Sequence, residues 1–327
     1  MKRWLLALAV IALSGLAAVL VVGASPWAAA AAAFDSSLGS PRAVQESLVK
    51  TIPLLWCGLA VALAFRAGVW NIGAEGQLVA GAVLGTAAAV VLPPGWWSLP
   101  LVLLAGCFGG ALWAGIAALL KTMAGVNEVL STILLNLVAQ ALLGWAVHGP
   151  LKEPGGAYPQ SAQLPREAWL LHPFSPGRLH LGLVVVLVAA VLFALALRRT
   201  TWGLEVRAVG DNPEAARVCG LPVGRIQGWV LVASGALAGL GGAVEVAGVT
   251  RRLFESLSPG WGYSGIAVAL LGNLEPIGVV CAAVLFGGMA AASGGMQRVA
   301  GVPAVGALLI QGLVVVALAW LAQREKR

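Results

Sequence analysis

A polar stretch between two apolar runs contains the side chains best suited to bind or guide a solute. Residues 65–77 read FRAGVWNIGAEGQ and include Asn71, Glu75 and Gln77. Asn71 and Glu75 are four residues apart, so on a helix they share one face. The glycines of this stretch would loosen such a helix. Among apolar runs, irregular backbone is tolerated only where it lines a cavity or is buried in protein.

The composition indicates that the elements around this stretch span a membrane. Of the 327 residues, 60% are hydrophobic and 10% are charged, with a mean hydropathy of +0.92. A soluble domain carries roughly 25% charged residues. The net charge of +7 comes from basic residues at the ends of apolar runs. That placement favours orientation in a bilayer over a nucleic-acid partner.

The apolar runs predict an all-α integral membrane protein, a single domain over residues 1–327, with about ten spanning helices. About 20 apolar residues cross a bilayer. The expected spans are 4–23, 48–65, 76–93, 99–120, 128–147, 179–198, 227–248, 303–322 and two more within 261–293. With ten spans both termini lie inside, which suits the basic residues at each end, and 148–178 is an outer loop.

The first run also resembles a secretory signal peptide. It has a basic start and small residues after the apolar segment. The apolar part, about 19 residues long, exceeds a usual signal sequence. Cleavage would leave nine spans and place the termini on opposite sides. We therefore expect an uncleaved first helix.

The sequence lacks the common motifs of enzymes. Neither GxxxxGK[ST] nor HExxH is present, so we expect no ATP site and no such zinc site in this chain. Residues 262–265 have the GxSG form of intramembrane serine proteases, but no histidine follows His180 to act as the base. Neither the three histidines nor the four cysteines show metal-ligand spacing. We expect no catalytic and no metal-binding residue.

A short helix is predicted within the polar inner loop 199–226, over about 211–219. Asp211 or Asn212 can cap its free N–H groups, and Pro213 suits the first helical position. Glu214 lies in the first turn, where the helix dipole favours a carboxylate. Gly220 can end the helix in a left-handed conformation. Such an exposed helix could dock into a groove of a partner protein.

Three motifs in this order resemble the permease subunits of ATP-binding-cassette (ABC) importers. They are FRAGVWNIGAEGQLVAGAVLG, NEVLSTILLN and GLEVRAVGDNPEAARVCGLPVGRI. The resemblance covers about residues 45–320. It is strongest to the nucleoside-type members of the branch that also contains ribose-type sugar permeases. Sugar members carry a Gly-Ile-Asp-Leu-Ser-type run in place of residues 71–77. Nucleosides are therefore the preferred substrates and a ribose-type sugar the alternative.

The resemblance implies a larger assembly in a bacterial inner membrane. Two permease chains, identical or related, would form a type II importer-like bundle with two ATPase subunits and an outer substrate-binding protein or lipoprotein. ATP and magnesium would bind the ATPase subunits. The loop helix would be the coupling helix, with the residues Asp211, Asn212, Pro213, Glu214, Arg217 and Gly220.

For the polar stretch two interpretations remain open. Trp70, Asn71, Glu75, Gln77 and Asn136 line a passage or its gate, or Glu75 holds the fold together. Alanine at Glu75 separates them: lost transport with intact assembly indicates a passage, and lost assembly a structural clamp. The runs 48–147 and 227–322 would form an inverted repeat, a hypothesis from topology alone, with matching breaks at 65–77 and 259–265.

Two further residue groups carry expectations. Asn136 and Gln140 are four apart and should face the same interior. Glu245 should form an interfacial pair with Arg251 or Arg252. Glu245 and Glu75 are also the carboxylates that an ion-coupled secondary transporter would use, which is an alternative from another class of protein. Copurification with an ATPase would exclude that alternative.

Overall fold

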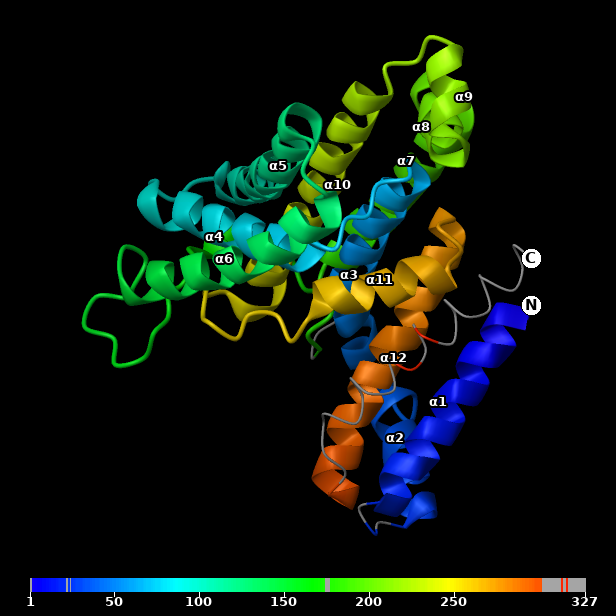
Figure 1. Ribbon diagram of the computed structural model, residues 1–327. Coiled ribbons are helices and arrows are strands. Elements are labelled where there is room, and N and C mark those ends of the chain that lie inside the picture. Colours follow the sequence, from blue (N-terminus) through cyan, green and yellow to red (C-terminus); the bar gives the residue numbers. More distant parts are fainter. Residues whose placement is uncertain are drawn as a thin grey trace.

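The protein is a helical bundle (Figure 1), described here from a computed structural model. The structure describes residues 2–21, 23, 25–173, 177–301, 313 and 316, and within them finds only two isolated β-bridges. The helices are α1 (Lys2–Val21), α2 (Pro26–Ser37), α3 (Pro41–Arg66), α4 (Ala74–Val91), α5 (Ser98–Ala124), α6 (Glu128–His148), η1 (Arg166–Ala168), α7 (Gly182–Arg199), α8 (Thr201–Asp211), α9 (Pro213–Val218), α10 (Val223–Glu245), η2 (Val246–Thr250), α11 (Trp261–Leu271) and α12 (Pro276–Ala300).

Seven described helices are long and apolar enough to cross a membrane: α3, α4, α5, α6, α7, α10 with its π-helical extension η2, and α12. Helix α1 coincides with the first predicted span. The region 261–293 was expected to hold two spans, but α11 has 11 residues and is too short to cross alone. The predicted span 303–322 lies outside the described residues, apart from 313 and 316. The expected total of about ten is therefore not confirmed.

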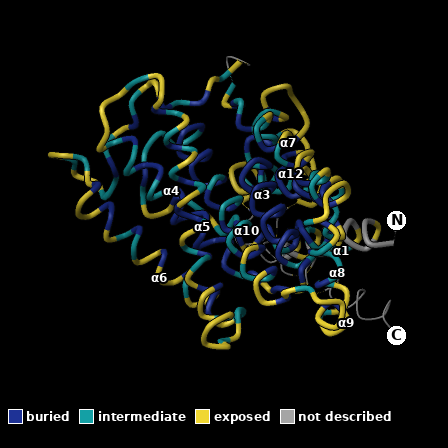
Figure 2. The backbone as a smooth tube through the Cα atoms, turned by 90° about the horizontal axis from the view of Figure 1, so that it is seen from above, coloured by how far each residue is buried: buried dark blue, intermediate teal, exposed yellow. Residues whose placement is uncertain are grey.

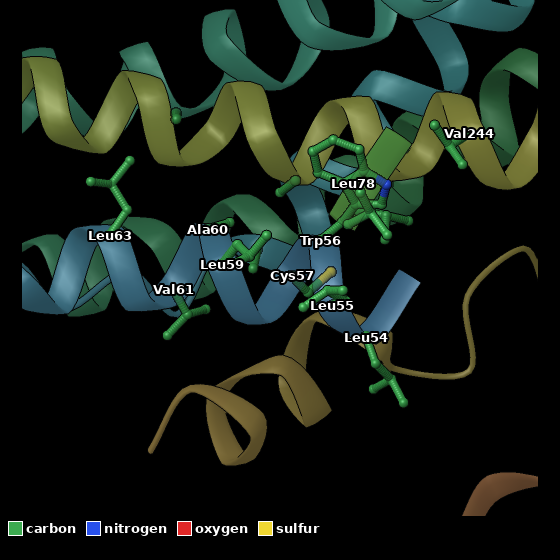
Figure 3. Packing of buried hydrophobic residues seen from close by; sticks show 14 of the residues in the cluster. Leu54, Leu55, Trp56, Cys57, Leu59, Ala60, Val61, Leu63, Leu78 and Val244 are labelled. Carbon is green, nitrogen blue, oxygen red and sulfur yellow. The ribbon is translucent and has the colours of Figure 1, made fainter. Parts of the chain in front are cut away.

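Helices α3 and α10 form the buried centre. In the most apolar stretch of each helix, 83% of the residues are buried in α3 and 72% in α10 with η2, against 28% in α7. Figure 2 shows these two helices in dark blue between more exposed neighbours. Trp56 of α3 is fully buried and packs on α10, since a Cβ atom on Gly241 would lie 2.6 Å from the Trp56 Cβ atom; Figure 3 draws it in one cluster with Leu78 of α4 and Val244 of α10. Figure 3 also shows the short helix α11 passing next to α3.

Glycines allow α4, α5 and α10 to cross almost in backbone contact. A Cβ atom on Gly81 would lie 2.3 Å from the Cα atom of Gly239, and one on Gly110 would lie 2.1 Å from the carbonyl oxygen of Gly235. These residues belong to three pairs of glycines spaced four residues apart: 81 and 85, 106 and 110, and 235 and 239. In a bilayer such pairs let helices approach closely. The structure brings all three pairs into one crossing.

Two short helices form the polar end after α7. The sequence predicted one helix near 211–219, whereas the structure has α8 and then α9. Thr200 caps α8 by accepting a hydrogen bond from the Gly203 backbone N–H at 3.1 Å. Asp211 is the last residue of α8 and not a cap. The short helix α2 near the N-terminus, which Ser25 caps, was also not predicted from the sequence.

Candidate functional site

The polar stretch forms a break between α3 and α4. Helix α3 ends at Arg66, whose guanidinium pairs with Glu275, and Gly68 takes a left-handed conformation with φ of +70°. Helix α8 packs directly on this break, since a Cβ atom on Gly210 would lie 1.9 Å from the carbonyl oxygen of Arg66. The side chain of Gln227, from the start of α10, donates to the Ala67 carbonyl at 3.3 Å. The break is thus in contact with both elements that flank α9.

Asn71 fixes the irregular segment inside the protein. Its amide nitrogen donates to Ser234 Oγ at 2.8 Å and to Gln77 Oε1 at 2.9 Å. Its oxygen accepts from the Gly73 N–H and from Gln77 Nε2. Ser234 in turn donates to the Ala60 carbonyl at 2.6 Å. A buried amide needs such partners, because an unsatisfied one costs about 1–3 kcal/mol.

Glu75 joins the starts of two helices. It lies in the first turn of α4, is 2% exposed, and accepts a hydrogen bond from the Gly262 N–H of α11 at 2.6 Å. Gly262 leaves no room for a side chain, since its Cβ atom would lie 2.1 Å from the Glu75 nitrogen. Both helix N-termini carry free N–H groups and a positive partial charge, which suit a carboxylate between them. The two breaks that the sequence paired therefore meet at Glu75.

Asn136 ties α6 to the same junction. Its oxygen accepts from the Gly76 N–H at 2.8 Å, and its nitrogen donates to the Ile72 carbonyl at 3.0 Å and to the Tyr263 hydroxyl at 3.2 Å. Thr132, one turn earlier, accepts from the Ile72 N–H. Four of the five predicted passage residues, Asn71, Glu75, Gln77 and Asn136, therefore form one buried cluster, here called the polar junction.

The exposed surface of the polar junction is aromatic. Trp70 is 55% exposed, and its ring lies 4.7 Å from that of Phe65. Tyr263 is 47% exposed, and its hydroxyl is held by Asn136. The sequence singled out Trp70 but treated Tyr263 only as part of a GxSG match. The signal that could have found Tyr263 is its place in the second break, at the first turn of α11.

Helix α9 has the predicted caps. Asn212 Oδ1 accepts from the Glu214 N–H at 3.1 Å and from the Ala215 N–H at 3.0 Å, and Pro213 is the first helical residue. Gly220 has φ of +83°. Glu214 and Arg217 form an ion pair at 2.6 Å on the exposed side. The helix is short and ordered by its caps, and it projects from the bundle (Figure 1).

At the opposite end, residues 149–173 and 177–181 dock onto the segment that follows α10. Ser161 donates from its backbone to the Leu253 carbonyl at 2.8 Å. Arg252 pairs with Glu153 at 2.5 Å, which holds the pKa of that carboxyl below its usual range. Arg251 lies 3.9 Å over the ring of Trp169. The expected pair of Glu245 with Arg251 or Arg252 is therefore wrong, because both arginines have other partners.

His180 is a buried histidine at this docked end. It is 1% exposed, and its ring fills the space between Gly182 and Gly248, where Cβ atoms would lie 2.5 Å and 2.4 Å from it. Its Nδ1 accepts from the Gly182 N–H at 3.1 Å. Burial, together with His172 and Arg178, lowers the pKa of His180 to about 4. The neutral imidazole is therefore the form that fits the folded loop.

Acid should loosen the docked loop through His180. The folded pKa is below the unfolded value of about 6.5. The stabilisation is therefore complete above pH 6.5 and is lost as the pH falls from 6.5 to about 4, by roughly 3 kcal/mol in all. We expect the hydrogen-exchange protection factors of residues 168–173 and 177–181, which correct for slower intrinsic exchange in acid, to fall relative to those of α3 between pH 7 and pH 5. The variant His180→Gln should lack this pH dependence; an equal fall in it would contradict the role of His180.

The described residues hold no group of three or more His, Cys, Asp or Glu side chains that could bind a metal ion. What they do hold is a polar junction where two broken segments meet inside a bundle of apolar helices. That arrangement is typical of membrane transporters, in which discontinuous helices place polar groups near the path of the solute.

Comparison with known proteins gives the family. Residues 43–319 match the family described as branched-chain amino acid transport system / permease component, and the chain belongs to this family of multi-pass membrane permeases.

Three relatives are similar over most of their length. The glucose ABC transporter permease protein TsgB13 of Haloferax volcanii is 38% identical, covering 95% of this chain and 84% of the relative. The guanosine ABC transporter permease protein NupP of Bacillus subtilis is 36% identical, covering 89% and 84%. The nucleoside ABC transporter permease protein NupB of Lactococcus lactis is 33% identical, covering 81% and 76%. Each of these organisms has a second permease that is 27% identical to this chain.

Proposed function

We propose that this chain is the permease subunit of an ATP-driven ABC importer that moves nucleosides into the cell. The observation that carries the proposal is the polar junction, whose exposed surface is formed by the rings of Trp70 and Tyr263. A nucleoside combines a flat base with a polar edge, so rings and amides suit it better than a full counter-charge. The relatives named for guanosine and nucleosides support this substrate class.

A sugar is the alternative substrate, since the relative with 38% identity is named for glucose. Stimulation of ATP hydrolysis separates the two. The purified complex, with its binding protein in lipid nanodiscs, should hydrolyse ATP faster on addition of guanosine and not of glucose or ribose. Stimulation by glucose alone would move the chain to the sugar importers. The ion-coupled alternative loses support, because the relatives are ABC transporter permeases and Glu75 bonds the start of α11.

The proposed complex places catalysis outside this chain. ATP and magnesium bind the separate ATPase subunits, and a substrate-binding protein or lipoprotein delivers the solute. The chain itself is not an enzyme and binds no nucleic acid. The α9 end carries Arg198, Arg199, Arg207 and Arg217, so we place it on the cytoplasmic side of a bacterial inner membrane. The proposed topology puts both termini on the same side.

We infer that the second permease of this complex is a related but different chain. Three organisms each have one permease with 33–38% identity to this chain and another with 27%. This pattern is expected when two paralogues form the two halves of one passage. Affinity purification of the tagged chain should recover a second permease in a 1:1 ratio. Recovery of this chain alone, as a dimer with the ATPase, would contradict the inference.

Helix α9 is proposed as the element that couples ATP hydrolysis to transport. Glu214, Arg217 and the following Gly220 are exposed, and Pro213 is half-buried at the start of the helix. Asp211 and Asn212 connect it to α8, which packs on the break after α3 through Gly210. A rotation of α9 against the ATPase would therefore move the break and the polar junction with it.

The cap of α9 offers a direct test of this coupling. Asn212→Ala removes the acceptor for two backbone N–H groups and destabilises the helix by about 1 kcal/mol. We expect uptake to fall severalfold, while the thermal stability of the solubilised chain changes little because the helix is exposed. The matched control Asn212→Ser keeps a capping oxygen and should keep uptake. Equal uptake in both variants would contradict the role of α9.

A further inference from the structure

A line of polar or small residues runs along α6, at intervals of four. Its members are Glu128, Thr132, Asn136, Gln140, Gly144 and His148, here called the α6 line. Residues four apart on a helix are neighbours on its surface. At one end Glu128 Oε1 accepts from the Trp70 N–H at 3.5 Å. At the other, His148 lies 3.3 Å from Glu255 Oε1. The line therefore runs from the first break, past the polar junction, to the segment that precedes the second break.

Gln140 is the member of this line that the junction leaves open. It lies in the middle of a spanning helix and is exposed, and its side chain forms no hydrogen bond with the described part of the chain. Asn136, one turn before it, is 1% exposed and fully engaged. The sequence predicts that both face the same interior, whereas the structure buries Asn136 and exposes Gln140. A polar side chain at this depth needs water, a solute or protein beside it.

Tyr263 contacts α6 one helical turn before Gln140. Its hydroxyl accepts a hydrogen bond from Asn136 at 3.2 Å, which fixes the ring one helical turn from Gln140. The ring is 47% exposed in spite of this anchor. An exposed aromatic ring and an exposed amide are therefore held about one helical turn apart along α6, both on helices.

Irregular backbone is exposed at both ends of the α6 line. The irregular segment 67–73 exposes Gly68 and Trp70, and the segment 251–260 exposes Glu255. Exposed non-helical backbone does not face hydrocarbon, because its N–H and C=O groups need polar partners. Gln140 lies between these two segments, and its own amide, unpaired within the described part of the chain, also needs a polar neighbour, so we expect a water-filled passage or the second permease chain beside it.

We propose that Tyr263 and Gln140 form a contact site for the base of the transported solute, a flat heterocycle. The Tyr263 ring stacks on the base, and the Gln140 amide, which both donates and accepts, bonds to its polar edge. This site deepens the proposed function and rests on it. Neither residue is required for the polar junction to hold the breaks together, since Asn136 keeps two other hydrogen bonds there.

Cysteine labelling tests whether the two positions line a passage. The full complex is made with the four native cysteines replaced, and Gln140→Cys or Tyr263→Cys is then introduced. Both should react with a water-soluble thiosulfonate, because that reaction needs a hydrated thiolate. Guanosine should slow the reaction at least about fivefold. The control Val138→Cys, which is on another face of α6 and 52% exposed, should not react. No reaction at 140 and 263, or reaction that guanosine does not slow, would overturn the site.

Uptake measurements test the role of the ring. Since the binding protein determines the affinity for the solute, the informative quantity is the maximal rate. Tyr263→Leu should lower maximal guanosine uptake about tenfold, in line with the loss of one stacking ring, and Tyr263→Phe should stay within about twofold. Unchanged uptake in Tyr263→Leu would contradict the site. If the parent complex takes up no guanosine, the proposed function fails instead. If Tyr263→Leu does not fold, the labelling of Gln140→Cys decides.

Discussion

Replacing Gly239 by alanine is expected to prevent the bundle from assembling. The added methyl group would lie 2.3 Å from the carbonyl oxygen of Gly106 and 2.7 Å from the Cα atom of Gly110. No flexible side chain can yield there, because both contacts are backbone atoms of α5. Overpacking in a close-packed interior costs about 1–3 kcal/mol where neighbours can adjust, and more where they cannot. The measurement is the yield and unfolding temperature of the detergent-solubilised chain.

Gly115 provides the matched control on the same crossing pair of helices. It lies one turn and a half beyond Gly110 on α5, and nothing lies within 4 Å of its Cβ position. Gly115→Ala should leave the yield and the unfolding temperature unchanged or slightly higher, since alanine favours the helix by about 1 kcal/mol. Equal behaviour of the two variants would show that the three glycine pairs do not form the crossing described here.

Replacing Glu75 by alanine is expected to abolish uptake and to lower the unfolding temperature at the same time. The carboxylate accepts the Gly262 N–H and lies between the starts of α4 and α11. Its removal leaves buried donors without partners, at about 1–3 kcal/mol for each. We expect copurification with the ATPase to fall as well, because α11 leads to Glu275 and its ion pairs with Arg66 and Arg198.

The variant Glu75→Gln separates charge from geometry at this position. Its amide oxygen can still accept the Gly262 N–H, so we expect most of the stability to return. A passage role for Glu75 predicts a different pattern: Glu75→Ala would assemble normally with the ATPase, keep its unfolding temperature and fail only in uptake. That pattern would contradict the structural role that the geometry favours.

The sequence predicts this fold best where one strong local signal is present. Long apolar runs gave the positions of α3 to α7 and α10, and the Asn212-Pro213 pair with Gly220 gave the caps of α9. Helices α2 and α8 lack that signal. The first is short and rich in alanine, and the second is amphipathic within a polar loop. Helix α11 could not be separated from α12 by hydropathy, because both are apolar and only the length of α11 shows that it does not span.

The site was predictable in its members more than in its contacts. Asn71, Glu75, Gln77 and Asn136 were recognised because polar groups are costly among apolar runs. That they would bond to Ser234 and Gly262 could not be foreseen, since those partners are more than 150 residues away in the chain. Glu245 was paired with the wrong arginines for the same reason. Trp169 and Glu153, which take those arginines, belong to a loop whose docking only the tertiary structure determines.

Uptake in cells tests the central claim most directly. Labelled guanosine and glucose are supplied to cells with and without this chain, each with ATP depleted or with the ion gradient collapsed. The account predicts guanosine uptake that needs the chain and ATP and survives loss of the gradient. Guanosine uptake that is equal without the chain, or that follows the gradient and ignores ATP, would contradict it.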